Sequence, residues 1–187
     1  MRRSVLLPAT FAALLLGQNP KMFTPQYAGG DQLLRPEGYR DWKFVGSNVG
    51  MGYNEEGPRR PTFHNIFIQP EAYQQFAATG KFPDKTTLVM EVMSVGSSES
   101  INRHGQFQDR LMGIEVALKD EGKFPDKWAY FNFIGADGKA LASARPFPKE
   151  ACWKCHNEHG AHDNVFVEFY PVLRDAAGSR NLSNKVQ

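Results

Sequence analysis

Residues 107–118 read Phe-Gln-Asp-Arg-Leu-Met-Gly-Ile-Glu-Val-Ala-Leu, and apolar side chains recur at every second position over the second half of this stretch. Successive side chains of a strand point to opposite faces, so the alternation predicts a strand with one apolar face. That face consists of Met112, Ile114, Val116 and Leu118. The other consists of Leu111, Gly113, Glu115 and Ala117. Glu115 therefore lies between two small residues that leave room for another group.

Further strands are predicted on both sides of this stretch. β-branched and aromatic residues favour strands over 42–45, 62–69, 86–95 and 128–134. Pro70 at a first helical position and Gly80 at the end predict a short helix over 71–79. We expect loops over 46–61 and 97–105, and a tight turn at Asp137-Gly138. The fold class predicted is mainly β (α+β), an antiparallel sheet with a few short helices.

The C-terminal part of the chain carries the run Cys152-Trp153-Lys154-Cys155-His156. A C-x-x-C-H run offers two thiols for thioether bonds to the vinyl groups of haem and an imidazole for its iron. The spacing of the two cysteines, which are the only ones in the chain, corresponds to about one helical turn. The run predicts one covalently attached haem c, with His156 as the iron ligand. We expect the other ring nitrogen of His156 to donate a hydrogen bond to a backbone carbonyl.

Two other interpretations of these cysteines stay open. A dithiol redox motif needs a strand-then-helix setting, which the residues around Cys152 do not suggest. A zinc site would join Cys152 and Cys155 to His159 and His162, at a histidine spacing tighter than that of zinc fingers.

The residues around this run predict two helices. Pro146 and Pro148 break the chain before a short helix that begins near Lys149 and bears the run. Asp163 is expected to cap a second helix, kinked at Pro171. Its apolar stripe, from which Phe166 or Phe169 is expected to pack near a porphyrin, consists of Val165, Phe166, Phe169, Tyr170 and Leu173.

Composition and the N-terminal sequence limit the classes of protein to which the chain can belong. The 187 residues include 22 basic and 20 acidic ones, without a basic patch, which fits one globular domain and argues against a nucleic-acid binder. Residues 1–17 combine Arg2-Arg3 with a short apolar stretch typical of a signal peptide, an uncleaved anchor being the alternative. We expect export to the periplasm, an extended arm over 18–36, and a haem domain over 37–187.

A chain rich in strands that ends in C-x-x-C-H resembles the cytochrome P-460 and cytochrome c′-beta family. The resemblance is carried by residues 38–46, 68–73, 86–96, 113–115, 128–129, the haem motif and the run Phe-Tyr-Pro-Val-Leu-Arg over 169–174. It implies a mainly antiparallel β domain, often a homodimer, with a five-coordinate haem whose second axial face is open.

Two positions distinguish the functions found within the family that this chain resembles. Family members that oxidise hydroxylamine carry a lysine bonded to a haem meso carbon, and that position corresponds to Met90 here. A thioether cannot form such a bond, and Lys85 lies about 17 Å away along an extended strand. Met90 is then a wall of the haem site, plain core filling, or a sulfur ligand of the iron.

The family's distal carboxylate, which takes protons from hydroxylamine, corresponds to Glu115. Without the resemblance, the sequence favours Glu115 as a solvated strand residue. The function predicted is binding of nitric oxide or a related small nitrogen-oxide ligand. The alternatives are oxidation of hydroxylamine or nitric oxide, with Glu115 as base and a soluble cytochrome as electron acceptor, and plain electron transfer.

Overall fold

The computed structural model describes residues 23–53 and 60–178. The expected signal peptide, 1–17, and the start of the expected arm lie outside these residues. No helix in the described ranges has the length and apolar character needed to cross a membrane.

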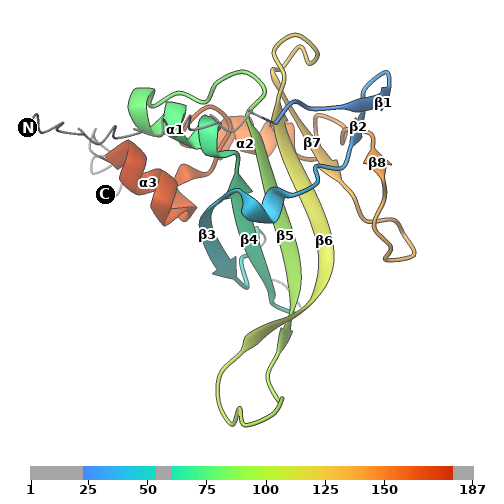
Figure 1. Ribbon diagram of the computed structural model, residues 1–187, viewed down its shortest axis with the longest axis vertical. Coiled ribbons are helices and arrows are strands. Elements are labelled where there is room, and N and C mark those ends of the chain that lie inside the picture. The colour runs from blue at the N-terminus through green and yellow to red at the C-terminus, as the bar shows by residue number, and fades with distance from the viewer. Residues whose placement is uncertain (1–22, 54–59, 179–187) are drawn as a thin grey trace, which may run out of the picture.

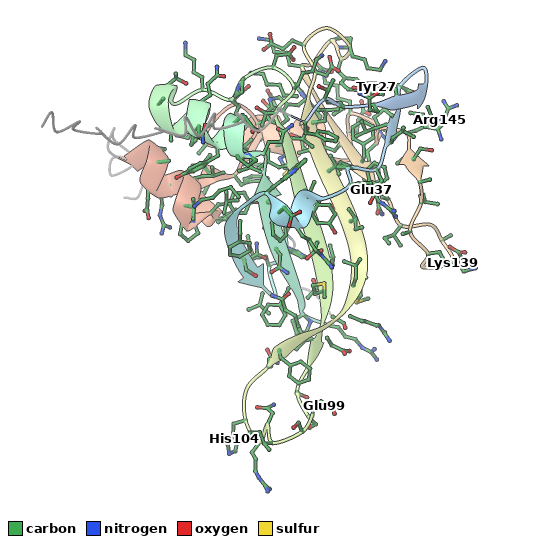
Figure 2. All side chains as sticks on the ribbon, in the orientation of Figure 1. Tyr27, Glu37, Glu99, His104, Lys139 and Arg145 are labelled. Atoms are coloured by element: carbon green, nitrogen blue, oxygen red, sulfur yellow. The ribbon has the colours of Figure 1, made fainter. Side chains whose placement is uncertain are left out.

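A five-stranded sheet forms the centre of the molecule (Figure 1). Each strand pairs antiparallel with the next one along the chain, which confirms the predicted mainly β class. The strands are β3 (Lys43–Val49), β4 (Thr62–Ile68), β5 (Thr87–Gly96), β6 (Phe107–Lys119) and β7 (Trp128–Asn132). β5 and β6 are the longest strands, and their hairpin extends well beyond the rest of the fold (Figure 1). Figure 2 shows Glu99 and His104 at its tip.

The register of the sheet places one residue of each inner strand in a common row. Ile66 pairs with Met90, Met90 with Glu115, and Glu115 with Asn132. Side chains directly opposite each other on neighbouring strands lie on the same face. Met90 and Glu115, singled out separately from the sequence, are therefore cross-strand neighbours.

The two faces of the sheet pack against different structures. One face is covered by a small sheet of β1 (Tyr27–Gly29), β2 (Gln32–Leu34) and β8 (Ser143–Ala144) and by a short 3-10 helix, Tyr39–Asp41. The core on this side includes Leu33, Val89, Val116, Leu118, Phe131 and Phe133. The stretch 18–36, expected as an extended arm, thus forms a hairpin from Tyr27 to Leu34.

The helices lie over the other face. α1 (Pro70–Thr79) begins at Pro70 and ends at Gly80, whose φ of 72° is a conformation that glycine adopts without strain. α3 (Pro171–Gly178) packs beside α1 and next to β3, as Figure 1 shows. The core on this side contains Ile66, Ile68, Phe76, Leu88, Trp128, Tyr130 and Leu173. α2 (Trp153–His159) follows Cys152 on the same side.

Four local predictions are wrong. The helix that bears the C-x-x-C-H run begins at Trp153 and not near Lys149, because turns occupy 149–152 before it. β3 continues to Val49, into the expected loop 46–61, because its backbone pairs with β4 as far as Phe63. Pro171 begins α3 and does not kink a longer helix, since a first-turn proline needs no N–H partner. Asp163 caps no helix: Asp163 and Asn164 form a two-residue turn, and a 3-10 helix, Val167–Phe169, follows.

Candidate haem site

A cavity lies between the helix-covered face of the sheet and α2. Its volume is about 580 Å³, including the part that opens to solvent. Most of the lining is apolar or aromatic, and it includes Ile66, Leu88, Met90, Glu115, Tyr130, Phe147, Cys152, His156, Asn164, Phe166 and Tyr170. The structure thus brings Met90, Glu115, Cys152 and His156 to one cavity.

His156 projects from α2 into this cavity. Its Nδ1 lies 2.9 Å from the backbone oxygen of Asn164. A carbonyl only accepts, so Nδ1 carries the proton and Nε2 keeps a free lone pair. This confirms the expected hydrogen bond to a backbone carbonyl. The ring packs between Tyr130 and Phe166, with centroids 4.2 and 4.6 Å away. Burial lowers the pKa of His156, while the hydrogen bond to Asn164 acts in the opposite direction.

A tight turn presents the carbonyl that His156 bonds. Asp163 and Asn164 have φ angles of 46° and 64°, and backbone hydrogen bonds join His162 to Val165 on either side. Positive φ at both central residues is the requirement of a type I′ turn, and Asp and Asn tolerate it better than most residues. The Asp-Asn dipeptide was the sequence signal for this turn.

Gly160 allows the end of α2 to approach the turn. A Cβ at this position would lie 2.5 Å from the His156 backbone oxygen and 2.8 Å from the Asn164 carbonyl carbon. Both atoms are backbone and cannot rotate away. Glycine is therefore a steric requirement for the contact between the helix and the turn.

The two cysteines flank the first turn of α2. Cys152 lies immediately before the helix, is partly buried and lines the cavity, whereas Cys155 is exposed. Burial raises the pKa of the Cys152 thiol, and the nearby Glu115 and Cys155 add to the effect. Trp153 anchors the helix by donating from Nε1 to the Asp126 carbonyl at 3.2 Å.

Met90 and Glu115 form the part of the cavity wall that belongs to the sheet. Gly113, the next residue on the same face of β6, lies against Val92, and a Cβ there would be 3.2 Å from the valine side chain. Burial raises the pKa of Glu115, and no hydrogen bond from a described residue acts against this shift. Glu115 is therefore a half-buried carboxylate facing a cavity, with a weakened tendency to ionise.

Other residues weighed from the sequence lie elsewhere. Lys85 bonds to Asp120 at the start of β5, outside the cavity lining. His162 packs edge-on against Phe76, with ring centroids 6.0 Å apart, and His159 is exposed beside Glu158. Across the described ranges, His, Cys, Asp and Glu side chains form no group of three suited to a metal ion. Phe166 lines the cavity, whereas Phe169 is 42% exposed and reaches it only through its contact with Phe166.

Several cavity residues carried no sequence signal of their own. Tyr130 was placed only within an expected strand, yet its hydroxyl donates to the Asn164 carbonyl at 3.2 Å. Asn164 also has a buried side-chain nitrogen, Nδ2, without a hydrogen-bond partner. A buried donor of this kind is normally satisfied, so its presence in the lining fits a site for a ligand that has acceptor atoms. A mainly apolar cavity, a histidine with a free Nε2 and a cysteine at its edge fit haem.

These features define the class: a c-type cytochrome built on an antiparallel sheet. A model of the family Cytochrome P460 matches residues 36–167, more than two thirds of the chain. The chain belongs to this family, and it is a haem protein of c type. None of the curated proteins compared with it matches.

Proposed function

We propose that the protein holds one haem c and binds nitric oxide, or a related small nitrogen-oxide ligand, at the iron face opposite His156. Cys152 and Cys155 form the thioether bonds, and Nε2 of His156 binds the iron. The haem supplies an iron that coordinates diatomic ligands. The chain orients His156, surrounds the site with apolar side chains and restricts the entry of water.

One observation carries this proposal: His156 is the single histidine in the described cavity lining, and no lysine is present there. Histidine nitrogen is a common protein ligand of haem iron, so His156 would hold the iron, and no second histidine or lysine of the described lining would compete with an added ligand. Met90 is another residue of the lining whose side chain could bind iron. Its position between Ile66 and Glu115 in the cross-strand row is also that of a wall residue.

Absorption spectra of the purified ferric and ferrous protein, with and without nitric oxide, test the proposal. We expect a five-coordinate high-spin spectrum that nitric oxide changes, and the same behaviour in Met90→Leu. A low-spin spectrum that becomes high-spin in Met90→Leu would contradict it and indicate an electron-transfer cytochrome. In His156→Ala the iron spectrum should change while the haem stays attached, and an unchanged spectrum would overturn the assignment of His156.

A second candidate, oxidation of hydroxylamine, is favoured by Glu115 alone. Its raised pKa and its place beside Met90 suit a group that accepts protons from a bound substrate. Electrons would pass to a soluble cytochrome. Turnover with hydroxylamine and an oxidised acceptor, abolished in Glu115→Gln, would support this activity.

The family's lysine–haem bond separates the two candidates further. We expect no such bond at Met90, and therefore no strongly red-shifted ferrous Soret band. Met90→Lys should place an amine at this position, and mass spectrometry after oxidant treatment would detect a new bond to haem. Absence of that bond would count against the correspondence between Met90 and the family's lysine.

Export to the periplasm and a homodimeric state complete the proposal. The N-terminal sequence supports export, and fractionation of cells that express the full chain tests it. Large exposed apolar side chains on β3 and β6 support a contact between two copies, namely Phe44, Val49, Leu111 and Met112. Light scattering of the haem-loaded protein would show whether a dimer forms.

A further inference from the structure

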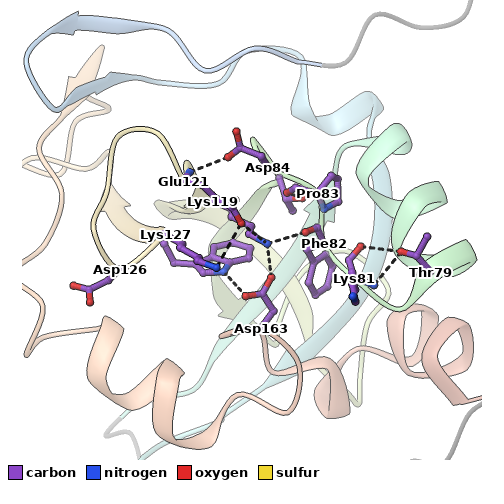
Figure 3. Close-up of polar contacts among 12 residues, drawn as sticks. Thr79, Lys81, Phe82, Pro83, Asp84, Lys119, Glu121, Asp126, Lys127 and Asp163 are labelled. Carbon is purple, nitrogen blue, oxygen red and sulfur yellow. Dashed lines mark hydrogen bonds and ion pairs between the residues drawn. The ribbon is translucent and has the colours of Figure 1, made fainter.

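An ion pair between a buried lysine, Lys119, and a partly exposed aspartate, Asp163, lies at the end of the sheet next to the haem site. The Lys119 side chain is 9% exposed, and its Nζ is 2.7 Å from Oδ2 of Asp163 and 2.8 Å from the backbone oxygen of Phe82 (Figure 3). Asp163 Oδ1 accepts a second hydrogen bond from Nε1 of Trp128 at 3.2 Å. The last residue of β6 and the first of β7 therefore both hold the Asp163 carboxylate.

Asp163 is a central residue of the turn that bonds His156. Its φ angle is 46°, a conformation in which aspartate is strained unless its surroundings hold it. The bonds from Lys119 and Trp128 supply that restraint. They fix the turn to the ends of β6 and β7.

The residue after Asp163, Asn164, connects this anchor to His156. The carbonyl of Asn164, the residue after Asp163, accepts from Nδ1 of His156 at 2.9 Å and from the hydroxyl of Tyr130 at 3.2 Å. A shift of the turn would move this oxygen away from both donors. The side chain of Asn164 makes neither bond, so the backbone position alone decides the contact.

We propose that Asp163, held by Lys119 and Trp128, is a positioning residue for His156. It keeps the Asn164 carbonyl on Nδ1, which fixes the tautomer and the ring orientation and directs Nε2 into the cavity. The inference rests on the proposed role of His156 as the iron ligand. In this proposal, the orientation of His156 is controlled by a carboxylate that does not itself line the cavity.

The hydrogen bond to Nδ1 has an electronic consequence for a metal-bound imidazole. An acceptor on the second nitrogen raises the basicity of the first, and loss of such partners typically weakens metal binding by about 10–100-fold. A histidine that donates less electron density stabilises ferric iron less. Weakening the anchor should therefore raise the reduction potential and lower the frequency of the iron–histidine stretch.

Three single substitutions in the haem-loaded protein test this inference. Asp163→Asn and Lys119→Met each remove the ion pair, and Trp128→Phe removes one hydrogen bond but retains an aromatic ring. Glu91→Gln is the control, because it neutralises the carboxylate of another ion pair, with Arg40 at 2.6 Å, on the opposite face of the sheet, where the carboxylate is buried and Arg40 is 64% exposed. The readouts are the reduction potential and the iron–histidine stretch in the ferrous Raman spectrum.

We expect shifts in both readouts for the first two variants, a smaller shift for Trp128→Phe, and wild-type values for Glu91→Gln. Wild-type values in all the variants that load haem would overturn the inference, as would an equal shift in Glu91→Gln. If Asp163→Asn does not fold, Lys119→Met and Trp128→Phe still decide the question. Nitric oxide binding by the wild-type protein tests the proposed function separately, since it does not depend on how Asp163 sets the histidine.

Discussion

Each face of the central sheet carries a glutamate carboxylate, but the two carboxylates have different surroundings. Glu91 on β5 points to the closed face, is 4% exposed, and accepts hydrogen bonds from the Tyr39 hydroxyl at 2.8 Å and Arg40 Nε at 2.6 Å. Glu115 on the neighbouring β6 points to the cavity, where burial raises its pKa and no residue in the described part of the chain offers a compensating hydrogen bond. Met90, which lies next to Glu91 in sequence, pairs with Glu115 across the strands.

This difference shows how one sheet separates stability from function. A buried carboxylate that has partners contributes to the packing of its face, whereas one without partners costs stability and remains available to a ligand. The closed face joins the two sheets into a core. The open face lacks such packing over the cavity. The candidate haem site occupies the space that is left there.

The largest effect should come from the closed face. Phe133→Ala removes a side chain that is 0% exposed and belongs to the core between the two sheets. We expect a loss of roughly 3–5 kcal/mol in the free energy of unfolding, from lost burial and the cavity left behind. Urea unfolding of the haem-loaded protein measures it. The spectrum of the nitric oxide adduct should be unchanged, and a loss below about 1 kcal/mol would show that this face is not the core.

The next effect lies on the open face and acts through the backbone. Gly160→Ala places a Cβ against the backbone of His156 and Asn164, so we expect a loss of roughly 1–3 kcal/mol together with a changed iron spectrum. Gly122→Ala is the control, because its nearest neighbour, Asp120 Oδ1, would be 3.8 Å away. The control should stay within about 0.5 kcal/mol of wild type. Equal losses in both variants would contradict a special role for Gly160.

Sequence reasoning reached the open face through the alternation in β6, the C-x-x-C-H run and the family resemblance. The period of two in β6 correctly separated Ile114, Val116 and Leu118 from Glu115, and the register then brought Met90 beside it. The strands and α1 were predictable because periodicity, Pro70 and Gly80 are local signals. The C-x-x-C-H run placed Cys152 and His156 at the cavity edge for the same reason.

What was missed depends on contacts between distant residues. The pairing of β2 with β8 joins Leu33 to Ala144, and neither short strand carries enough alternation to be recognised. Asp163 was interpreted as a helix cap because Asp is common there, but its partner Lys119 lies 44 residues earlier. Long-range ion pairs leave no mark on local sequence, so the anchor of the His156 turn required the structure.

Glu91→Gln should have an intermediate effect on the free energy of unfolding, and it tests the carboxylate of the closed face. The amide retains an acceptor for Tyr39 but loses the charge that holds Arg40, whose side chain is 64% exposed. Solvent screening of Arg40 reduces the value of the pair, so we expect a loss of about 1 kcal/mol at neutral pH. Thermal unfolding measures it. A gain in stability would show that the closed face does not use this carboxylate.

The smallest effect should come from Glu115→Gln, and its sign should be the reverse at neutral pH. The folded-state pKa of Glu115 is raised above its ordinary value of 4.5, so the folded protein holds this proton more tightly than the unfolded chain. Stability therefore falls as pH rises from 4.5 to the folded-state pKa and is constant above it. Glutamine cannot ionise, so the Glu115→Gln variant does not lose stability over this pH range. We expect Glu115→Gln to match wild type near pH 4 and to be slightly more stable at pH 8, as measured by urea unfolding at both values. A wild type that gains stability relative to the variant over this range would mean that Glu115 has a partner and that the open face resembles the closed one.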